Sequence, residues 1–373
     1  MLKLVLGASG SGKTTLLYAR IRARAEAGGR SILLVPEQFT SSTEARIYRE
    51  LGDALSGMVE SYSFTSLAEH ILAVEGGAAV QTLTDAGRAV LVRRALEELQ
   101  DNVHYYYRHR RSAAFCQMAA ETIDELKSAG LSGQQLQELA RDCGSESAKL
   151  GELALIFQGY ESLLAGTGMD PADRLELAAD RLEAALARDE LPDFLREREV
   201  FIDEFDTFNA PKKRLMGAML AALPAVTVAL CEDGAPMQPG DLELFSGAKQ
   251  VAAQLRQLAR KNGAQVAAPE LLRRDLRHKD APGLAALTEL LETGSCTPPE
   301  SAPELRLFAA ASREEEARCA AAAIRRLMRQ GVRCGKIAVI CRDISLYRAA
   351  VRYEFRMAEI PLYCDEPTTP EFS

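Results

Sequence analysis

A glycine-rich stretch near the first residue constrains the fold of this chain more than any other feature. It follows an apolar run at residues 2–6 and precedes a segment of helical periodicity at residues 13–25. The stretch matches the pattern G-x-x-x-x-G-K-[S/T] with Gly7, Ala8, Ser9, Gly10, Ser11, Gly12, Lys13 and Thr14. A glycine turn can match this pattern by coincidence, but a place between a strand and a helix is the one that a phosphate-binding P-loop requires.

The P-loop (Walker A motif) predicts a nucleotide site. Its glycines let successive backbone N–H groups turn toward phosphate oxygens, and the amino terminus of the following helix adds its positive dipole end. Lys13 is expected to bring a positive charge to the β and γ phosphates, and the hydroxyl of Thr14 to ligate magnesium. We therefore predict that residues 7–15, Thr15 included, bind ATP with Mg²⁺.

An acidic pair follows a second strand-like run at residues 200–202. Asp203 at the end of a strand can hold magnesium through water, and the adjacent Glu204 can orient and deprotonate the water that attacks the γ phosphate. Asp203 is thus a predicted metal ligand and Glu204 a predicted catalytic residue in a Walker B motif. Two solvated acids at the end of a strand are the alternative.

The order of strand and helix signals predicts an α/β protein. Strands and helices alternate over residues 1–81 and again over 198–300, which indicates one mostly parallel sheet with helices on its faces. Residues 82–197 carry helix formers without a strand pattern, so we expect an all-helical insertion. After an expected linker at 297–303, residues 301–373 begin a second α/β unit that stops unfinished.

More local expectations follow from the same patterns. In the second unit, strands are expected at residues 305–309 and 336–341, with helices at 314–330 and 347–357. The basic run at residues 273–279 is expected to be the solvated face of a helix.

Composition limits the kinds of partner. A formal net charge of -8 argues against a small basic module that coats nucleic acid, so any DNA site must be local. No apolar run reaches the ~18 residues of a membrane span, and residues 1–15 lack the features of a secretory signal. We therefore expect a cytoplasmic protein without a membrane partner.

One segment is a candidate for DNA contact on composition alone. Residues 105–111 interleave tyrosines with cations, a combination that can stack bases and neutralise phosphates, and Tyr106 and Arg108 are the predicted contacts. A partly buried helix with a solvated basic face is the alternative.

The order of motifs resembles that of the UvrD-like superfamily 1 helicases. The stretches similar to their motifs I, Ia, Ib and II are the P-loop, residues 32–38, residues 61–68 and residues 201–205. The resemblance implies two RecA-like domains: 1A at 1–81 and 198–300, interrupted by the 1B insertion, and the start of 2A at 301–373. It also makes Ser63, Phe64 and Thr65 candidates for DNA contact. Arg342 is the candidate for the motif IV arginine that reaches the γ phosphate, a surface arginine being the alternative.

Within that superfamily the sequence is similar to the AddB (RexB) family, on residues 35–38, 202–208 and 226–230. Members are the B subunits of AddAB helicase-nucleases, which process double-strand DNA breaks in repair and recombination. The resemblance implies an ATP-binding, helicase-like region that pairs with an A subunit, the motor, and binds single-stranded DNA or DNA ends. The nuclease domain of that family, with its iron-sulfur cluster, is expected to be absent from this sequence.

Departures from the helicase pattern leave other functions open. Residues 231–234 lack the G-D-x-x-Q of motif III, and Thr65 replaces a histidine of motif Ib, so coupling of hydrolysis to DNA movement is expected to be lost. Glu204 is present, so whether ATP is hydrolysed or only bound stays open. The alternatives are an autonomous superfamily 1 translocase with DNA-stimulated hydrolysis and a P-loop kinase of small molecules.

Overall fold

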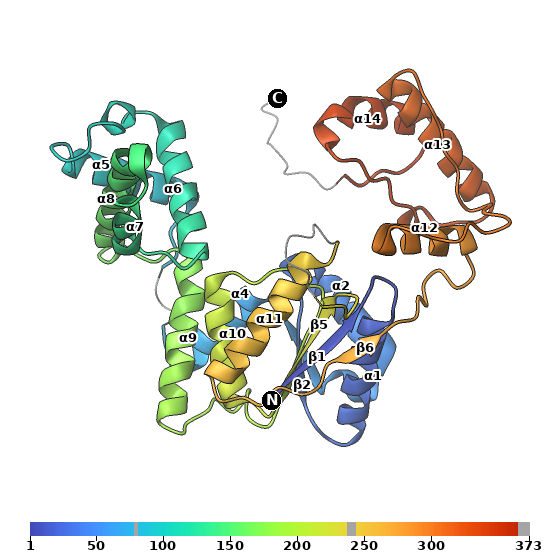
Figure 1. Ribbon diagram of the computed structural model, residues 1–373, viewed down its shortest axis with the longest axis horizontal. Helices are drawn as coiled ribbons and strands as arrows, with labels where there is room; N and C mark the ends of the chain where they lie inside the picture. The colour runs from blue at the N-terminus through green and yellow to red at the C-terminus, as the bar shows by residue number, and fades with distance from the viewer. Residues whose placement is uncertain (78–80, 237–243, 365–373) are drawn as a thin grey trace. The chain divides into compact units, whose positions relative to one another are not determined.

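A parallel sheet of six strands lies at the centre of the first of two units in the chain (Figure 1). The computed structural model describes residues 1–77, 81–236 and 244–364, and the chain divides after Asp280. The strand order is β3-β2-β4-β5-β1-β6. The strands are β1 (Leu2–Gly7), β2 (Ser31–Leu34), β3 (Val59–Tyr62), β4 (Glu199–Ile202), β5 (Ala225–Cys231) and β6 (Glu270–Leu272). The expected parallel α/β sheet is confirmed.

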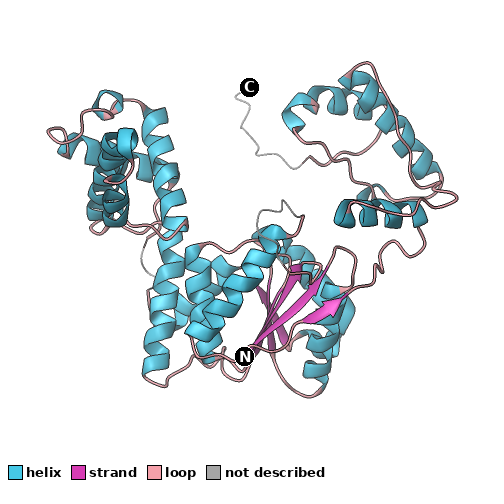
Figure 2. Cartoon of the chain, in the orientation of Figure 1, coloured by secondary structure: helices cyan, strands magenta, loops and turns pink. Residues whose placement is uncertain are grey.

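Helices cover both faces of this sheet. Successive side chains of a strand point to opposite faces, and here both sets are apolar and need cover. In β1, Leu4 packs with α4, α9, α10 and α11, whereas Val5 packs with α1 and α2 on the opposite face. The helices of the core are α1 (Lys13–Glu26), α2 (Thr40–Leu51), α3 (Asp53–Ser56), α4 (Phe64–Glu75), α10 (Ala210–Ala222) and α11 (Ser246–Lys261). Figure 2 shows the strands enclosed between these helices. Over the described ranges, no helix combines the length and the apolar character that a bilayer crossing needs.

The expected helical insertion is present and has its own apolar core. Leu96, Ile123 and Phe157, from three different helices, are buried in it. Its helices are α5 (Asp85–Glu98), α6 (Ala113–Ser128), α7 (Gly133–Ala140), α8 (Ser147–Leu164) and α9 (Pro171–Ala187). Helix α9 begins in the insertion and packs along α4 and α10, so it carries the chain back to the sheet.

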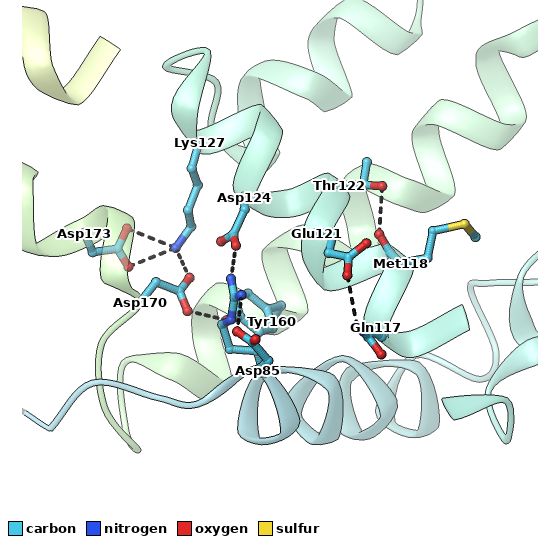
Figure 3. Close-up of polar contacts among 11 residues, drawn as sticks. Asp85, Gln117, Met118, Glu121, Thr122, Asp124, Lys127, Tyr160, Asp170 and Asp173 are labelled. Carbon is cyan, nitrogen blue, oxygen red and sulfur yellow. Dashed lines mark hydrogen bonds and ion pairs between the residues drawn. The ribbon is translucent and has the colours of Figure 1, made fainter. Parts of the chain in front are cut away.

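A buried ionic cluster joins α6, α8 and the start of α9 (Figure 3). The Lys127 ammonium donates to Asp170 over 2.6 Å and to Asp173 over 2.9 Å, and the Tyr160 hydroxyl donates to Asp170 over 2.5 Å. Burial alone would lower the pKa of Lys127, but its bonds to Asp170 and Asp173 raise it above the usual value. The Asp170 side chain is completely buried, so this cluster fixes the end of the insertion from which α9 departs.

The second unit contains three α-helices within its described residues: α12 (Pro282–Thr293), α13 (Arg313–Arg329) and α14 (Arg348–Met357). Ile324 and Phe355 pack α13 against α14. The unit begins at Ala281, ahead of the expected linker at 297–303. Residues on either side of that segment are in contact, since Glu304 accepts a hydrogen bond from the Gly283 N–H over 2.5 Å.

The two strands expected in this unit are wrong over the described residues. Residues 305–309 and 337–341 form no strand, and the side chains of Leu307 and Ile340 are 100% and 90% exposed. A strand needs hydrogen bonds to a neighbouring strand, and neither segment pairs with one in this part of the chain.

Candidate nucleotide site

The P-loop joins β1 to α1, as its sequence predicts. Gly10 and Gly12 have φ angles of 83° and 92°, in the left-handed region that favours glycine. The Lys13 ammonium donates to the carbonyl oxygens of Gly7 and Ala8 over 2.7 and 2.8 Å, so the lysine side chain folds back along the loop. Ser11 is buried, and its hydroxyl has no hydrogen-bond partner among the described residues. A loop that holds an unsatisfied hydroxyl and a lysine fits a phosphate group.

The acidic pair lies at the same edge of the sheet, where the carboxyl ends of the parallel strands meet. The Asp203 N–H donates to the Leu34 carbonyl over 3.0 Å, which extends the β2 and β4 pairing by one residue. The Asp203 side chain is buried, and one of its oxygens accepts the Glu204 N–H over 3.0 Å. This bond fixes the direction of a carboxylate, and carboxylate oxygens are the ligands that magnesium prefers.

Glu204 has an unusual backbone conformation and an unusual charge environment. Its φ of 64° lies in the left-handed region, which is costly for a residue with a side chain and is concentrated at functional sites. Burial, followed by the neighbouring Asp203 charge, raises the pKa of the Glu204 carboxyl, while Arg46 opposes the rise. Such a carboxyl is a stronger base than an exposed one.

One pocket of about 470 Å³ brings the two motifs together. Residues of the P-loop, of the acidic segment and of the neighbouring strand ends line it: Ser9, Gly10, Gly12, Lys13, Thr14, Thr15, Arg46, Asp203, Glu204, Phe205, Asp206, Ala229, Cys231, Leu276 and Arg277. Most of the predicted P-loop residues thus share one cavity with the acidic pair, whereas Gly7, Ala8 and Ser11 do not line it. Arg46, Leu276 and Arg277 are additions that the motifs did not indicate.

The basic run at residues 273–279 is not a helix, so that expectation is wrong. It is a loop after β6, and we call residues 275–278 the strap because they cross the P-loop. The Leu276 N–H donates to the Gly10 carbonyl over 3.0 Å, and the Arg277 guanidinium donates to the Ser9 hydroxyl over 3.1 Å. A Cβ on Gly10 would lie 2.8 Å from the Cβ of Arg277, so the glycine is needed for this approach.

The strap lies here because β6 pairs in parallel with β1, so both strands end at the edge that carries the P-loop. The sequence analysis did not predict this arrangement, because β6 has only three residues, Glu270–Leu272, and so short a segment gives a weak strand signal. The concentration of arginines after an apolar pair was the available signal.

Comparison with known proteins identifies the family. Residues 4–288 match the family model described as "ADDB, N-terminal". The chain belongs to this AddB family. Its relatives include the B subunits of three ATP-dependent helicase/deoxyribonucleases: it is 34% identical to that of Desulforudis audaxviator, 33% to that of Moorella thermoacetica and 31% to that of Symbiobacterium thermophilum. These similarities cover 98–99% of the chain but 32% of each relative, so the chain spans about a third of their length.

Ser63 and Phe64, two of the candidates for DNA contact from the stretch similar to helicase motif Ib, are buried. Ser63 caps α4, since its hydroxyl accepts the Ser66 N–H over 3.1 Å. The Phe64 ring is 2% exposed and meets the Phe205 ring edge to face at 5.2 Å. Thr65 is partly exposed and donates to Glu37 over 2.5 Å, so of the three it has the most accessible side chain.

The remaining predicted residues are Tyr106 and Arg108, in the helical insertion, and Arg342, in the second unit. Tyr106 is half-buried and stacks on Phe115 at 5.5 Å, whereas Arg108 is exposed on a short 3₁₀ turn, Tyr107–His109. The segment is therefore a loop with one helical turn, not the helix of the alternative interpretation. Arg342 is an exposed loop residue of the second unit, and its role at the γ phosphate stays a prediction.

Proposed function

We propose that this chain binds magnesium-ATP as the amino-terminal, helicase-like part of an AddB-type subunit that acts in DNA repair. The observation that carries the proposal is the single pocket that contains both the P-loop and the acidic pair. The relatives are named as B subunits of an ATP-dependent helicase/deoxyribonuclease, and this name supports an A subunit as partner and DNA as the substrate of the complex.

Different residues of the pocket would bind different parts of magnesium-ATP. Lys13 and the N–H groups of the P-loop would bind phosphate oxygens, and Thr14 and Asp203 would hold Mg²⁺. When bound, magnesium-ATP supplies an electrophilic γ phosphorus. Glu204 then has the place and the basicity to orient a water molecule and accept its proton.

The test is to measure magnesium-ATP binding and turnover with and without single-stranded DNA. We expect micromolar binding with slow turnover that DNA does not stimulate, because motif III is missing. Brisk DNA-stimulated turnover would favour an autonomous translocase, and turnover that requires a small acceptor would favour a kinase. Failure to bind any magnesium nucleotide would contradict the proposal.

Glu204→Gln should separate binding from hydrolysis. The amide cannot accept the proton, so we expect turnover to fall by about 100-fold or more, while affinity stays within about twofold. In the unaltered chain, a raised pKa means that Glu204 loses its charge at a higher pH than an ordinary glutamate. Turnover should therefore decline on acidification before the usual glutamate range is reached. Glu26→Gln, on an exposed part of α1, is the control and should change neither quantity.

Arg277→Ala should weaken nucleotide binding. The guanidinium donates to the Ser9 hydroxyl of the P-loop and lines the pocket, so we expect it to donate to a phosphate oxygen of a bound nucleotide. A hydrogen bond from a charged donor contributes about 1.5–3 kcal/mol, so the affinity should fall roughly tenfold or more. Arg274→Ala, an exposed arginine of the same basic run, should leave the affinity unchanged. Equal effects of the two substitutions would mean that the run acts only through its total charge.

A further inference from the structure

We propose that the loop between α5 and α6 is a preformed contact site for single-stranded DNA and that Glu152 is the positioning residue that sets its shape. We call residues 103–112 the tip loop; Figure 1 shows α5 and α6, which it joins, in the helical insertion. The inference rests on the proposed function in one respect, namely that the chain contacts DNA.

A carboxylate from another helix organises the backbone of the tip loop. Glu152, on α8, accepts the N–H groups of His104 and Tyr105 over 2.9 and 2.8 Å and that of Tyr106 over 3.2 Å. Three consecutive N–H groups that point at one carboxylate fix the loop in a single curve, because hydrogen bonds to a charged acceptor are the strong ones. Val103, at the start of the loop, is completely buried in the insertion core.

This curve divides the aromatic side chains between the core and the solvent. Tyr106 turns inward and stacks on Phe115, whereas Tyr105 is 55% exposed. The Tyr105 and Tyr106 rings are nearly perpendicular, with their centres 4.9 Å apart, and this contact supports the Tyr105 ring on one side. An exposed, supported tyrosine ring is a platform on which an unpaired base can stack. Tyr105 therefore replaces Tyr106 as the base contact.

The same loop carries arginines that are in no ion pair among the described residues. Arg108, Arg110 and Arg111 form no ion pair with any carboxylate that the structure describes. By contrast, Arg93 and Arg94 on the preceding helix are each paired with a glutamate one turn away. Within a chain of net charge -8, three unpaired arginines beside a stacking platform form a local site for a phosphate backbone.

The guanidinium of Arg110 is fixed in position by the neighbouring Tyr107. This guanidinium lies 3.8 Å from the centre of the Tyr107 ring and donates to the Tyr107 carbonyl over 3.1 Å. A guanidinium stacked on a ring keeps its charge exposed in a fixed direction at little cost in side-chain freedom. A duplex offers no free base face to Tyr105, so these features favour a single strand.

Binding of a labelled oligothymidylate, longer than the roughly 4–16 nucleotides that comparable sites cover, tests the site by fluorescence anisotropy over a range of salt concentrations. Tyr105→Ala should weaken binding about tenfold at every salt concentration. The double variant Arg108→Ala/Arg111→Ala should also reduce the slope of log K against log salt by about 1.4, or 0.7 for each lost phosphate contact. Arg141→Ala, an exposed arginine of the same insertion, should match the unaltered chain.

Glu152→Ala gives the sharpest readout, because positioning and simple electrostatics predict opposite signs. Removal of a negative charge near a DNA site strengthens binding if only charge matters. Loss of the three hydrogen bonds that Glu152 accepts from the tip loop should instead weaken DNA binding by roughly fivefold, with the slope of log K against log salt nearly unchanged. Glu152→Gln retains one acceptor oxygen and should be intermediate, and Glu138→Gln, on an exposed face of α7, is the control. Tighter or unchanged binding by Glu152→Ala would overturn the positioning role.

The tip-loop variants also separate this inference from the nucleotide proposal. Lys13→Ala should retain oligothymidylate binding, and the tip-loop variants should retain magnesium-ATP binding. If the unaltered chain binds no oligothymidylate, or binds it equally well with Tyr105, Arg108 and Arg111 replaced, the inference fails while the nucleotide site stands. Preference for a blunt duplex over the single strand would contradict the stacking role of Tyr105. Because these three side chains are at the surface, their replacement should leave the thermal unfolding midpoint within about 1 °C.

Discussion

Alanine in place of Lys13 is expected to remove magnesium-ATP binding, with a dissociation constant at least about 100-fold higher than that of the unaltered chain. The lysine brings the positive charge that a P-loop offers to the β and γ phosphates, and here its ammonium already lies within 2.8 Å of two carbonyl oxygens of the same loop. Its loss removes a charged hydrogen-bond donor from the phosphate site and also two bonds that order the loop before nucleotide arrives.

Isothermal calorimetry or a fluorescent ATP analogue measures this effect directly. Lys261→Ala, at the exposed end of α11, removes the same charge from the chain and should leave the affinity unchanged. Thermal unfolding without nucleotide checks that Lys13→Ala is folded. Retention of tight magnesium-ATP binding by a folded Lys13→Ala would mean that the pocket does not use the P-loop in the way its sequence implies.

Replacement of Asp170 by alanine is expected to lower the free energy of unfolding by about 3–5 kcal/mol. The carboxylate is completely buried and accepts both the Lys127 ammonium and the Tyr160 hydroxyl. Its removal leaves a buried cation with part of its compensation and a buried hydroxyl with no acceptor, and both are costly because the desolvation of each group is no longer offset. A fall of about 10 °C in the unfolding midpoint should accompany this loss.

Asp173→Ala is the matched control, because it removes the other carboxylate from the same lysine. The Asp173 side chain is 32% exposed, so water can replace it, and we expect a loss of about 1 kcal/mol or less. Circular dichroism during thermal and urea unfolding compares the two variants. Equal losses would show that total charge around Lys127, and not burial of Asp170, determines the stability of the α6, α8 and α9 junction.

Much of the candidate site could be predicted from the sequence because its chemistry is encoded in short local patterns. The glycine spacing around Lys13 and the two acids after residues 200–202 each depend on neighbours within a few positions. A parallel sheet then brings Thr14 and Asp203 to one edge, since all strands of such a sheet end on the same side. The helical insertion was equally accessible, because helix formers without strand alternation extend over its whole length.

Other features depend on residues that are distant in the chain. Arg277 meets Ser9 only because β6 pairs with β1, and Glu152 meets Tyr105 only because α8 packs beside the loop between α5 and α6. The burial of Phe64 likewise depends on Phe205, which arrives with another strand. The strand predicted at residues 305–309 is wrong for the same reason. An apolar pattern identifies one segment that could be a strand, but a strand forms only when a second segment pairs with it.

The sequence by itself therefore determined the class of the protein, the P-loop, the acidic pair and the division into sheet and helical insertion. The tertiary structure decided which further side chains enter the pocket, which aromatic of residues 105–107 faces solvent and which motif residues are buried. The physical reason is that local patterns specify backbone conformation and hydrophobic faces, whereas a contact between distant residues exists only once the packing of whole elements has brought their side chains within hydrogen-bonding distance.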